Sequence, residues 1–429
     1  MMLTLSSASL FILFSAVLLN IFFDKLKCNS LTIKYTNISV IFICSALLLH
    51  DYYSINMQLI NFDPRIIKIM PNNIGIFIAL SASALTSLAI LCSPNLSIGF
   101  LANLYGIYKI TCTTDFFNMY VGYEIVLIGF LFCLIKSGFS QWKQYLKYQM
   151  MASFIIVFGV ALFYLEQGHL IIFSQQKPFI SSYVMLIGFL IKCGIYPFGL
   201  WISLYKNMPN YISFWASGII TKISLYSILI LMPWIRMDAL PFKQINILEI
   251  LSIISSIFGS ILAYQSRENR KILSFHIMSQ IGILLNIAIF EFCFFDKSGN
   301  FYLTKLYLLH HIWTKSTLFL MEDCKKSWIL KYAALSLVGA PLTPGFLAKF
   351  SALYFMISKQ YYLGAINLIF SSLITAFSME KFLNKNTYRL NYMKESGQKI
   401  NNINFKNKVS IASLLAHAIL ILGLMKAFI

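Results

Sequence analysis

The sequence is poor in charge and poorest in acidic residues. Only 11% of its 429 residues are charged, and 15 are Asp or Glu, whereas a soluble domain carries about 25% charged residues. Apolar residues make up 59% of the chain, and the mean hydropathy is +0.74. This balance excludes an ordinary soluble protein and predicts one polytopic membrane domain. The shortage of acids and of long outer loops also argues against a membrane-embedded glycosyl or acyl transferase, which needs polar groups clustered in such loops.

Several kinds of motif are missing. The opening stretch, LTLSSASLFILFSAVLLNIFF, has neither a basic n-region nor a small-residue cleavage site, so we interpret it as a retained span and not as a signal peptide. The eight cysteines form no CxxC pair and no ligand cluster, which predicts neither disulfides nor a zinc site. No group of residues suits a nucleophile, a metal or a redox cofactor, and we expect no cofactor.

Long apolar stretches run through the whole chain, and we interpret about fourteen of them as membrane spans. Helices are expected because backbone exposed to lipid must satisfy its own hydrogen bonds, and a barrel would show short alternating segments instead. The predicted fold class is therefore all-α and polytopic. The expected spans cover residues 1–23, 36–50, 73–94, 97–113, 115–135, 148–166, 178–204, 211–235, 246–265, 272–295, 302–321, 331–357, 361–379 and 409–428.

The basic residues predict the orientation of these spans. A net charge of +19 could indicate nucleic-acid binding, but most basic residues lie in short loops between apolar stretches, so no nucleic acid is expected. One side of the predicted topology collects about twenty Lys and Arg residues and the other about ten, which places the first side in the cytoplasm and both termini outside. The most basic loop, 380–408, is expected to be cytoplasmic, and it is a candidate contact for a partner subunit or anionic lipid.

Five charged residues lie well inside the predicted spans, away from the span ends, where they are costly. An ammonium at bilayer depth costs at least about 2.5–3.5 kcal/mol on insertion scales, so an intramembrane charge is by default a candidate for function. Lysine suits proton handling because its pKa falls on burial, whereas arginine stays charged. A nearby carboxylate favours the protonated lysine, so moving that partner could switch the lysine between holding and releasing a proton. The five residues are Glu124, Lys192, Lys222, Lys315 and Lys349.

Histidines add to this pattern. His276 lies in KILSFHIMSQIGILL, and His311 and Lys315 are four residues apart, so they share a helix face. Histidine titrates near neutral pH and can bridge sites of proton exchange, although a buried histidine can also be an ordinary hydrogen-bonded core residue. His310 is expected to be a bystander. Lys305, near a span end, is expected to extend to the membrane interface.

Two of the lysines lie beside residues that interrupt a helix. Pro197 follows Lys192 in GFLIKCGIYPFGLW, and Lys349 follows Pro341, Pro344 and Gly345 in SLVGAPLTPGFLAKF. The two segments are five spans apart, and a repeat with an odd number of spans has inverted topology. Interrupted helices at matching positions of two inverted halves indicate the ion site of a transporter.

At this point the sequence resembles a known family. The blocks GFLIKCGIYPFGLW, SGIITKISLYSI, RKILSFHIMSQIGIL, HIWTKSTLFL and SLVGAPLTPGFLAKF are similar, in order and spacing, to those of the proton-conducting antiporter-like membrane subunits. That family comprises the antiporter-type subunits of respiratory complex I (NADH:quinone oxidoreductase), related subunits of membrane-bound hydrogenases, and the D-type subunit of multi-subunit Na+/H+ antiporters. The resemblance implies fourteen helices with two inverted five-helix repeats that contain broken helices.

The resemblance also implies roles for individual residues. Glu124 matches the family's buried acid, which modulates Lys192 in the broken seventh helix. Lys222 matches a connecting lysine, and Lys349 matches the lysine of the broken twelfth helix near the exit path. His276, His311 and Lys315 match positions along a hydrated axis. The implied function is translocation of protons, or of a cation against protons, across a bacterial cell membrane or a mitochondrial inner membrane, in a complex with other membrane subunits.

One departure from the family leaves alternatives open. The segment after the seventh helix, ISLYKNMPNYISFW, keeps Pro209 but lacks the aspartate that is usual there. The chain could therefore be a divergent subunit of complex I, a subunit of a multi-subunit Na+/H+ antiporter, or a structural member that no longer conducts. We divide it into N-terminal helices (1–113), two repeat cores (115–235 and 246–379), the basic loop (380–408) and a last helix (409–429).

Overall fold

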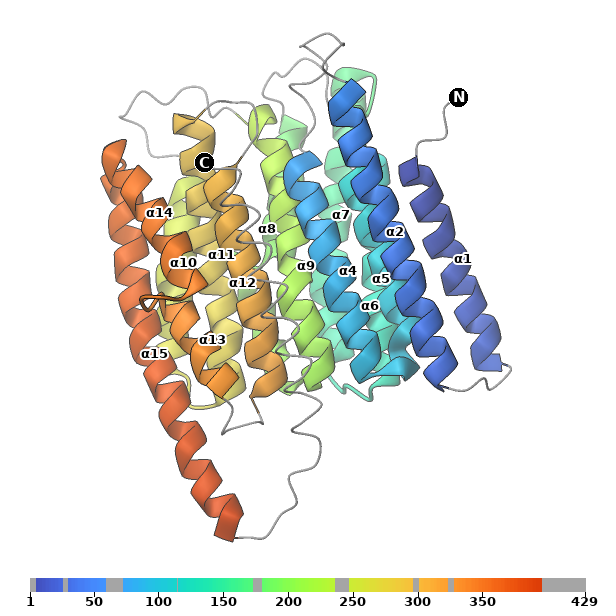
Figure 1. Ribbon diagram of the computed structural model, residues 1–429. Helices are drawn as coiled ribbons and strands as arrows, with labels where there is room; N and C mark the ends of the chain where they lie inside the picture. The colour runs from blue at the N-terminus through green and yellow to red at the C-terminus, as the bar shows by residue number, and fades with distance from the viewer. Residues whose placement is uncertain are drawn as a thin grey trace. The chain divides into compact units, whose positions relative to one another are not determined.

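The computed structural model describes residues 5–25, 30–58, 72–113, 115–172, 180–235, 247–295, 301–322 and 328–395. These residues are helical almost throughout (Figure 1), and the strand-like pairing among them is a single isolated bridge between Asp115 and Ile171. Nine of the described helical segments are long and apolar enough to cross a membrane. The prediction of an all-α membrane protein is confirmed. Its finer details, fourteen spans in two inverted repeats, stay predictions.

The helices fall into two compact units. Unit 1 holds the chain up to Lys192 and the part of α9 that begins at Ile223, and unit 2 holds most of the remainder. The helices of unit 1 are α1 (Leu5–Lys25), α2 (Ser30–Gln58), α4 (Asn72–Cys92), α5 (Ser97–Cys112), α6 (Phe116–Lys136), α7 (Trp142–Gln167) and α8 (Ile180–Cys193). A short 3-10 turn, η2 (Pro94–Leu96), joins α4 to α5, and another, η4 (Met232–Trp234), follows α9 (Asn210–Leu231).

In unit 1, small residues let α5 and α6 pack closely. A Cβ placed on Gly106 would lie 2.8 Å from the carbonyl oxygen of Gly122, and one on Gly129 would lie 3.0 Å from the backbone of Asn103. Small residues at helix interfaces are the usual way in which membrane helices gain close packing. This contact fixes α6, the helix that carries Glu124.

Unit 2 contains the residues from η3 to α15. Its elements are η3 (Phe198–Asn207), α9 up to Lys222, α10 (Ile247–Gln265), α11 (Asn269–Phe294), α12 (Tyr302–Met321), α13 (Trp328–Val338), α14 (Pro344–Ser358) and α15 (Tyr362–Glu395). Every residue from Ile272 to Glu291 of α11 and from Leu303 to Met321 of α12 is buried. These two helices, which carry both predicted histidines and Lys315, therefore form the centre of the unit.

The predicted spans differ from the helices in three places. The predicted span 178–204 consists of α8 followed by η3, and the span 331–357 consists of the half-helices α13 and α14. The predicted loop 380–408 begins as helix, because α15 continues to Glu395 and extends past the ends of α13 and α14 (Figure 1). The predicted last helix, 409–428, lies outside the described residues.

Candidate functional site

In unit 1, Lys192 lies in the last turn of α8 and only 3% of it is exposed. The helix ends directly after it, because Gly194 has a positive φ of 83° and the proline at 197 cannot continue a regular helix. The Nζ atom of Lys192 donates a hydrogen bond of 3.0 Å to the hydroxyl of Ser153 on α7. It also lies 5.2 Å from the centre of the Tyr123 ring. A cation is favoured at this position because the C-terminal end of a helix carries partial negative charge.

Glu124 follows Tyr123 on α6 and interacts electrostatically with Lys192. The ammonium, however, makes its hydrogen bond to Ser153 and not to this carboxylate. The Oε1 atom of Glu124 is buried and has no hydrogen-bond partner among the described residues. The hydroxyl of Tyr123 donates to the carbonyl of Ile223 at 2.9 Å. Tyr123 thus joins the Lys192 ammonium to the part of α9 that belongs to unit 1.

In unit 2, Lys349 binds the end of a broken helix. The half-helix α13 ends at Val338, Gly339 takes a φ of 92°, and α14 begins at Pro344 after the N-cap Thr343. The Nζ atom of Lys349 donates to the carbonyl oxygens of Leu337 and Val338, both at 2.9 Å. The last carbonyls of a helix lack partners within the helix and carry the negative end of its dipole. The break therefore supplies the oxygens that hold the buried ammonium.

Three further predicted residues lie near the centre of unit 2, and all are fully buried. Lys222 donates to the carbonyl of Ser217, one turn earlier on α9. Lys315 donates to the carbonyl of Leu273 on α11 at 3.2 Å. Neither ring nitrogen of His311 has a hydrogen-bond partner among the described residues. Lys222, His311 and Lys315 lie close enough to interact electrostatically.

His276 on α11 extends this group. Its Nε2 atom lies 2.8 Å from the hydroxyl of Ser378 on α15, and its ring interacts electrostatically with Lys315 and Lys349. The structure thus brings together five of the predicted residues in unit 2 and the other two, Glu124 and Lys192, in unit 1. The five are Lys222, His276, His311, Lys315 and Lys349.

The charges in unit 2 determine what this cluster can do. Among the residues that the structure describes, no Asp or Glu forms an ion pair with Lys222, Lys315 or Lys349. Several ammonium groups in a medium of low dielectric repel one another strongly. They cannot all be charged at once without a large cost, and histidines lie between them. Exchange of protons among these groups is the chemistry that the arrangement favours.

Comparison with known proteins shows which family the chain resembles. The sequence profile described as "NADH:quinone oxidoreductase/Mrp antiporter, TM" matches residues 113–325. The D-type subunit of the Na(+)/H(+) antiporter of Alkalihalophilus pseudofirmus is 28% identical over 314 residues, which cover 65% of this chain and 62% of that protein. Over about half of its length the chain is thus similar in sequence to this family of antiporter-like membrane subunits. Six of the seven predicted charged or histidine residues lie within the matched region, and Lys349 follows it.

Two other proteins extend the comparison. NADH-quinone oxidoreductase subunit N of Francisella tularensis is 23% identical over 312 residues, covering 63% of this chain and 64% of that subunit. The matches therefore span less than two thirds of the length of either relative. A chain of respiratory complex I from Thermus thermophilus has a similar fold, with a TM-score of 0.77 at 16% identity over 97% of both chains. The antiporter-like fold thus extends over the chain beyond the region matched in sequence.

Two residues differ from the sequence-based expectation. His310, expected to be a bystander, lies 3.4 Å from the hydroxyl of Ser336 on α13, and that hydroxyl accepts a hydrogen bond from the backbone N–H of Gly345. His310 therefore contacts the break between α13 and α14. Lys305, expected at the interface, is only 3% exposed and lies over the ring of Tyr302 at 4.8 Å.

Two buried acids that lie within predicted spans of unit 2 are missing from the sequence-based prediction. Glu249 is 6% exposed, and Glu291 is 5% exposed. Glu291 accepts hydrogen bonds from the backbone N–H groups of Leu303 and Thr304 at 2.6 and 2.8 Å, and so caps the start of α12. Both acids lie a few residues inside predicted spans. The criterion that selected Glu124, an acid within an apolar stretch, would have found them.

Proposed function

We propose that the chain is an ion-translocating membrane subunit that moves protons, or exchanges a cation for protons, as part of a larger membrane complex. The observation that carries this proposal is the pair of buried ammonium groups at broken helices, Lys192 beside α8 and Lys349 beside α13. Helix packing gives no reason to bury these charges, which are costly within a membrane. The names of the relatives, one a Na(+)/H(+) antiporter subunit and the other an NADH-quinone oxidoreductase subunit, support both forms of the proposal.

In the proposed mechanism, protons enter from the cytoplasm near Lys222, pass to Lys192, continue along His276, His311 and Lys315, and leave by way of Lys349. Glu124 and Lys192 act as the gate. While the carboxylate is charged, it stabilises the ammonium; when its influence is removed, the buried ammonium loses its electrostatic support and releases its proton. The electrostatic interaction between these two residues in unit 1 supports this role.

The proposed setting follows from the spans and the loop charges. We propose fourteen spans in two inverted repeats, with both termini on the non-cytoplasmic side. The subunit would lie in a bacterial cell membrane or a mitochondrial inner membrane and contact other membrane subunits of a respiratory or antiporter complex. The wide apolar surface of its helices, with Phe42 75% exposed and Phe154 65% exposed, suits contact with lipid or with such subunits.

The experiment that tests the proposal compares two lysines of unit 1 in the complete complex, reconstituted into vesicles. Lys192→Ala should abolish proton flux, a loss of at least about 100-fold, which is typical of removing a positioned proton-transfer group. Lys143 is exposed on α7, and Lys143→Ala should leave flux unchanged. Assembly is measured by the subunit content of the purified complex. Normal flux in an assembled Lys192→Ala complex would instead favour a structural, non-conducting member of the family.

A further inference from the structure

The helices α10, α11 and α15 of unit 2 share a buried polar seam that the proposed path does not use. On α10 and α15 the polar residues are spaced three or four positions apart and on α11 they are seven apart, and each spacing places them on one face. All of them are buried. The polar seam consists of Glu249, Ser252 and Ser256 on α10, Ser279 and Asn286 on α11, and Asn367, Ser371, Thr375 and Ser378 on α15.

Hydrogen bonds connect the three helices across this seam. Ser256 donates to the side-chain oxygen of Asn367 at 2.5 Å, and the hydroxyl of Ser279 donates to the carbonyl of Ser256 at 2.9 Å. Asn286 donates to the hydroxyl of Ser252 at 3.2 Å. The helices approach closely here, since a Cβ on Gly282 would lie 2.5 Å from the backbone nitrogen of Ser256. These contacts join the three helices along the seam.

One end of the seam reaches the cluster of charged residues. Ser378 lies 2.8 Å from His276, which interacts electrostatically with Lys315 and Lys349. The other end lies at Tyr361, just before α15 begins at Tyr362. The 17 residues from Tyr361 to Ser378 correspond to about 25 Å of helix, most of the thickness of a bilayer core. The seam therefore connects the central cluster to one end of the unit.

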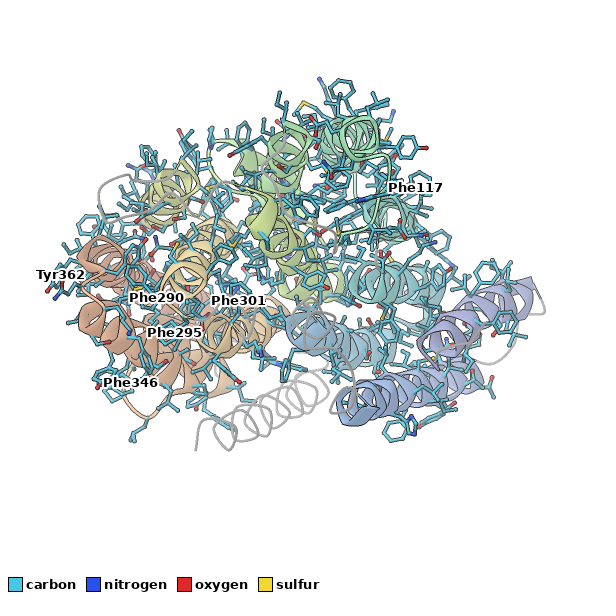
Figure 2. The ribbon with its side chains drawn as sticks, turned by 90° about the horizontal axis from the view of Figure 1, so that it is seen from above. Phe117, Phe290, Phe295, Phe301, Phe346 and Tyr362 are labelled. Atoms are coloured by element: carbon cyan, nitrogen blue, oxygen red, sulfur yellow. The ribbon has the colours of Figure 1, made fainter. Side chains whose placement is uncertain are left out.

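That end holds the buried acid Glu249, in the first turn of α10. The hydroxyl of Tyr361 donates to its carboxylate, and the side-chain amide of Asn286 donates to the Tyr361 oxygen at 3.3 Å. The Tyr361 hydroxyl thus bonds Glu249 directly, and Asn286 bonds Tyr361. The Tyr361 ring stacks against Phe290 at 5.4 Å, and Phe290 in turn lies 5.7 Å from Phe295, its neighbour in Figure 2. Aromatic rings cover the phenol and hold its hydroxyl in place.

Helix packing explains most of the seam but not this acid. Serine and threonine residues often pack membrane helices and bond back to their own carbonyls, as Ser371 does to Asn367. A carboxylate adds a desolvation cost that packing does not require. We propose that Glu249, held by Tyr361, is a proton-exchange site at the non-cytoplasmic end of unit 2. This inference rests on the proposed function. Lys349 passes its proton through His276 to the seam, and the Glu249 carboxylate takes up that proton at the far end and releases it to water.

The test measures proton flux in vesicles that contain the complete complex. Glu249→Gln should lower flux by about 100-fold, as expected for a lost proton-transfer group, and Glu249→Asp should restore part of it. Tyr361→Phe keeps the ring but removes the donor, and should lower flux about tenfold, comparable with the loss of a hydrogen bond to a charged group. Ser351→Ala is the packing control, because Ser351 lies on α14 outside the seam and its hydroxyl bonds only to its own helix, and it should leave flux unchanged.

The outcomes separate this inference from the proposed function. Normal flux in Glu249→Gln, together with lost flux in Lys192→Ala, would overturn the inference and leave the proposed function standing. Absence of flux in the unaltered complex would overturn the proposed function itself. If Glu249→Gln and Glu249→Asp lost flux to the same degree, a carboxylate at this position would not be what flux requires, Glu249 would act through packing, and the inference would be wrong.

Discussion

Lys192 and Lys349 both lie beside a break in a membrane helix, but on opposite sides of it. Lys192 is in the last turn of α8, before the break, and donates to the side chain of Ser153. Lys349 is in α14, after the break, and donates to two backbone carbonyls of α13. The first ammonium has an acid, Glu124, within electrostatic range, whereas the second interacts with His276, a group that can itself become positive.

This difference separates two tasks. An ammonium opposed by a carboxylate is stabilised in its charged form and so holds a proton. An ammonium among other basic groups is repelled by their positive charges. That repulsion favours loss of its proton. In the proposed mechanism, unit 1 therefore holds the proton and unit 2 passes it on. The comparison also predicts where mutations act, because the partners of Lys192 are side chains, whereas those of Lys349 depend on the backbone of the break.

The largest effect is expected from the acid that distinguishes unit 1. Glu124→Gln removes the charge that supports the Lys192 ammonium and leaves that ammonium buried without an opposing charge. Proton flux in reconstituted vesicles should fall by about 10- to 100-fold. The upper value corresponds to complete loss of a proton-transfer group, and a gate that is only weakened should lose less. Glu166, exposed at the end of α7, provides the control, and Glu166→Gln should have little effect.

A double-mutant cycle sharpens this prediction. Residues that act as one unit are not additive, with interaction energies of about 0.5–3 kcal/mol. The complex with both Glu124→Gln and Lys192→Ala should therefore be no slower than the worse single variant, measured as residual flux between pH 6 and 9. Additive losses at every pH would show that the two residues do not act as a pair, and the contrast between the units would then lose its basis.

A smaller effect is expected at the break of unit 2. Gly339 has a φ of 92°, and an added Cβ would lie 3.0 Å from Cδ of Lys349. Gly339→Ala should cost about 1–2 kcal/mol in the left-handed conformation and should also displace the Lys349 side chain, lowering flux several-fold. Gly168 has a φ of 71° with nothing near its Cβ position. Gly168→Ala should lower thermal stability to a similar degree but leave flux unchanged, and equal flux in both variants would contradict the assignment.

The sequence predicted the charged residues of the site well, because charges stand out in apolar stretches. It could not predict their partners. Lys349 binds the backbone carbonyls of Leu337 and Val338. Because every residue has a backbone carbonyl, the sequence does not mark these two, and only the geometry of the break makes them available. Glu249 and Glu291 were missed because residues near predicted span ends look interfacial, whereas neighbouring helices bury them here.

The same reasoning explains the differences in helix bounds. The stretch EKFLNKNTYRLNYMKE was expected to be a surface loop with some helix, and eight of its residues are Lys, Glu, Leu or Met, which favour helix. The structure accordingly continues α15 to Glu395. The span 331–357 was predicted as one stretch because hydropathy does not detect a break in a helix. Pro341, Pro344 and Gly345 indicated the position of the break. They did not indicate that Lys349 would bind the end of α13.

The smallest effect is expected from Tyr123→Phe, which together with Tyr123→Leu tests how side chains hold Lys192. Its ring lies 5.2 Å from the ammonium, and its hydroxyl donates to the carbonyl of Ile223. A cation–π contact contributes about 0.5–2 kcal/mol, and a neutral hydrogen bond contributes about 0.5–1.5 kcal/mol. Tyr123→Phe keeps the ring and should slow flux about threefold, whereas Tyr123→Leu removes both contacts and should slow it about tenfold or more.

The control for these variants is Tyr108→Phe, since Tyr108 is a buried tyrosine of unit 1 whose hydroxyl bonds to Ser83. It should leave flux unchanged while lowering stability by about as much as one hydrogen bond, about 1 kcal/mol. If Phe and Leu at position 123 slowed flux equally, the ring would contribute nothing to holding the ammonium. Lys192 would then depend on Ser153 and Glu124 alone. Like Lys349, it would gain nothing from an aromatic ring.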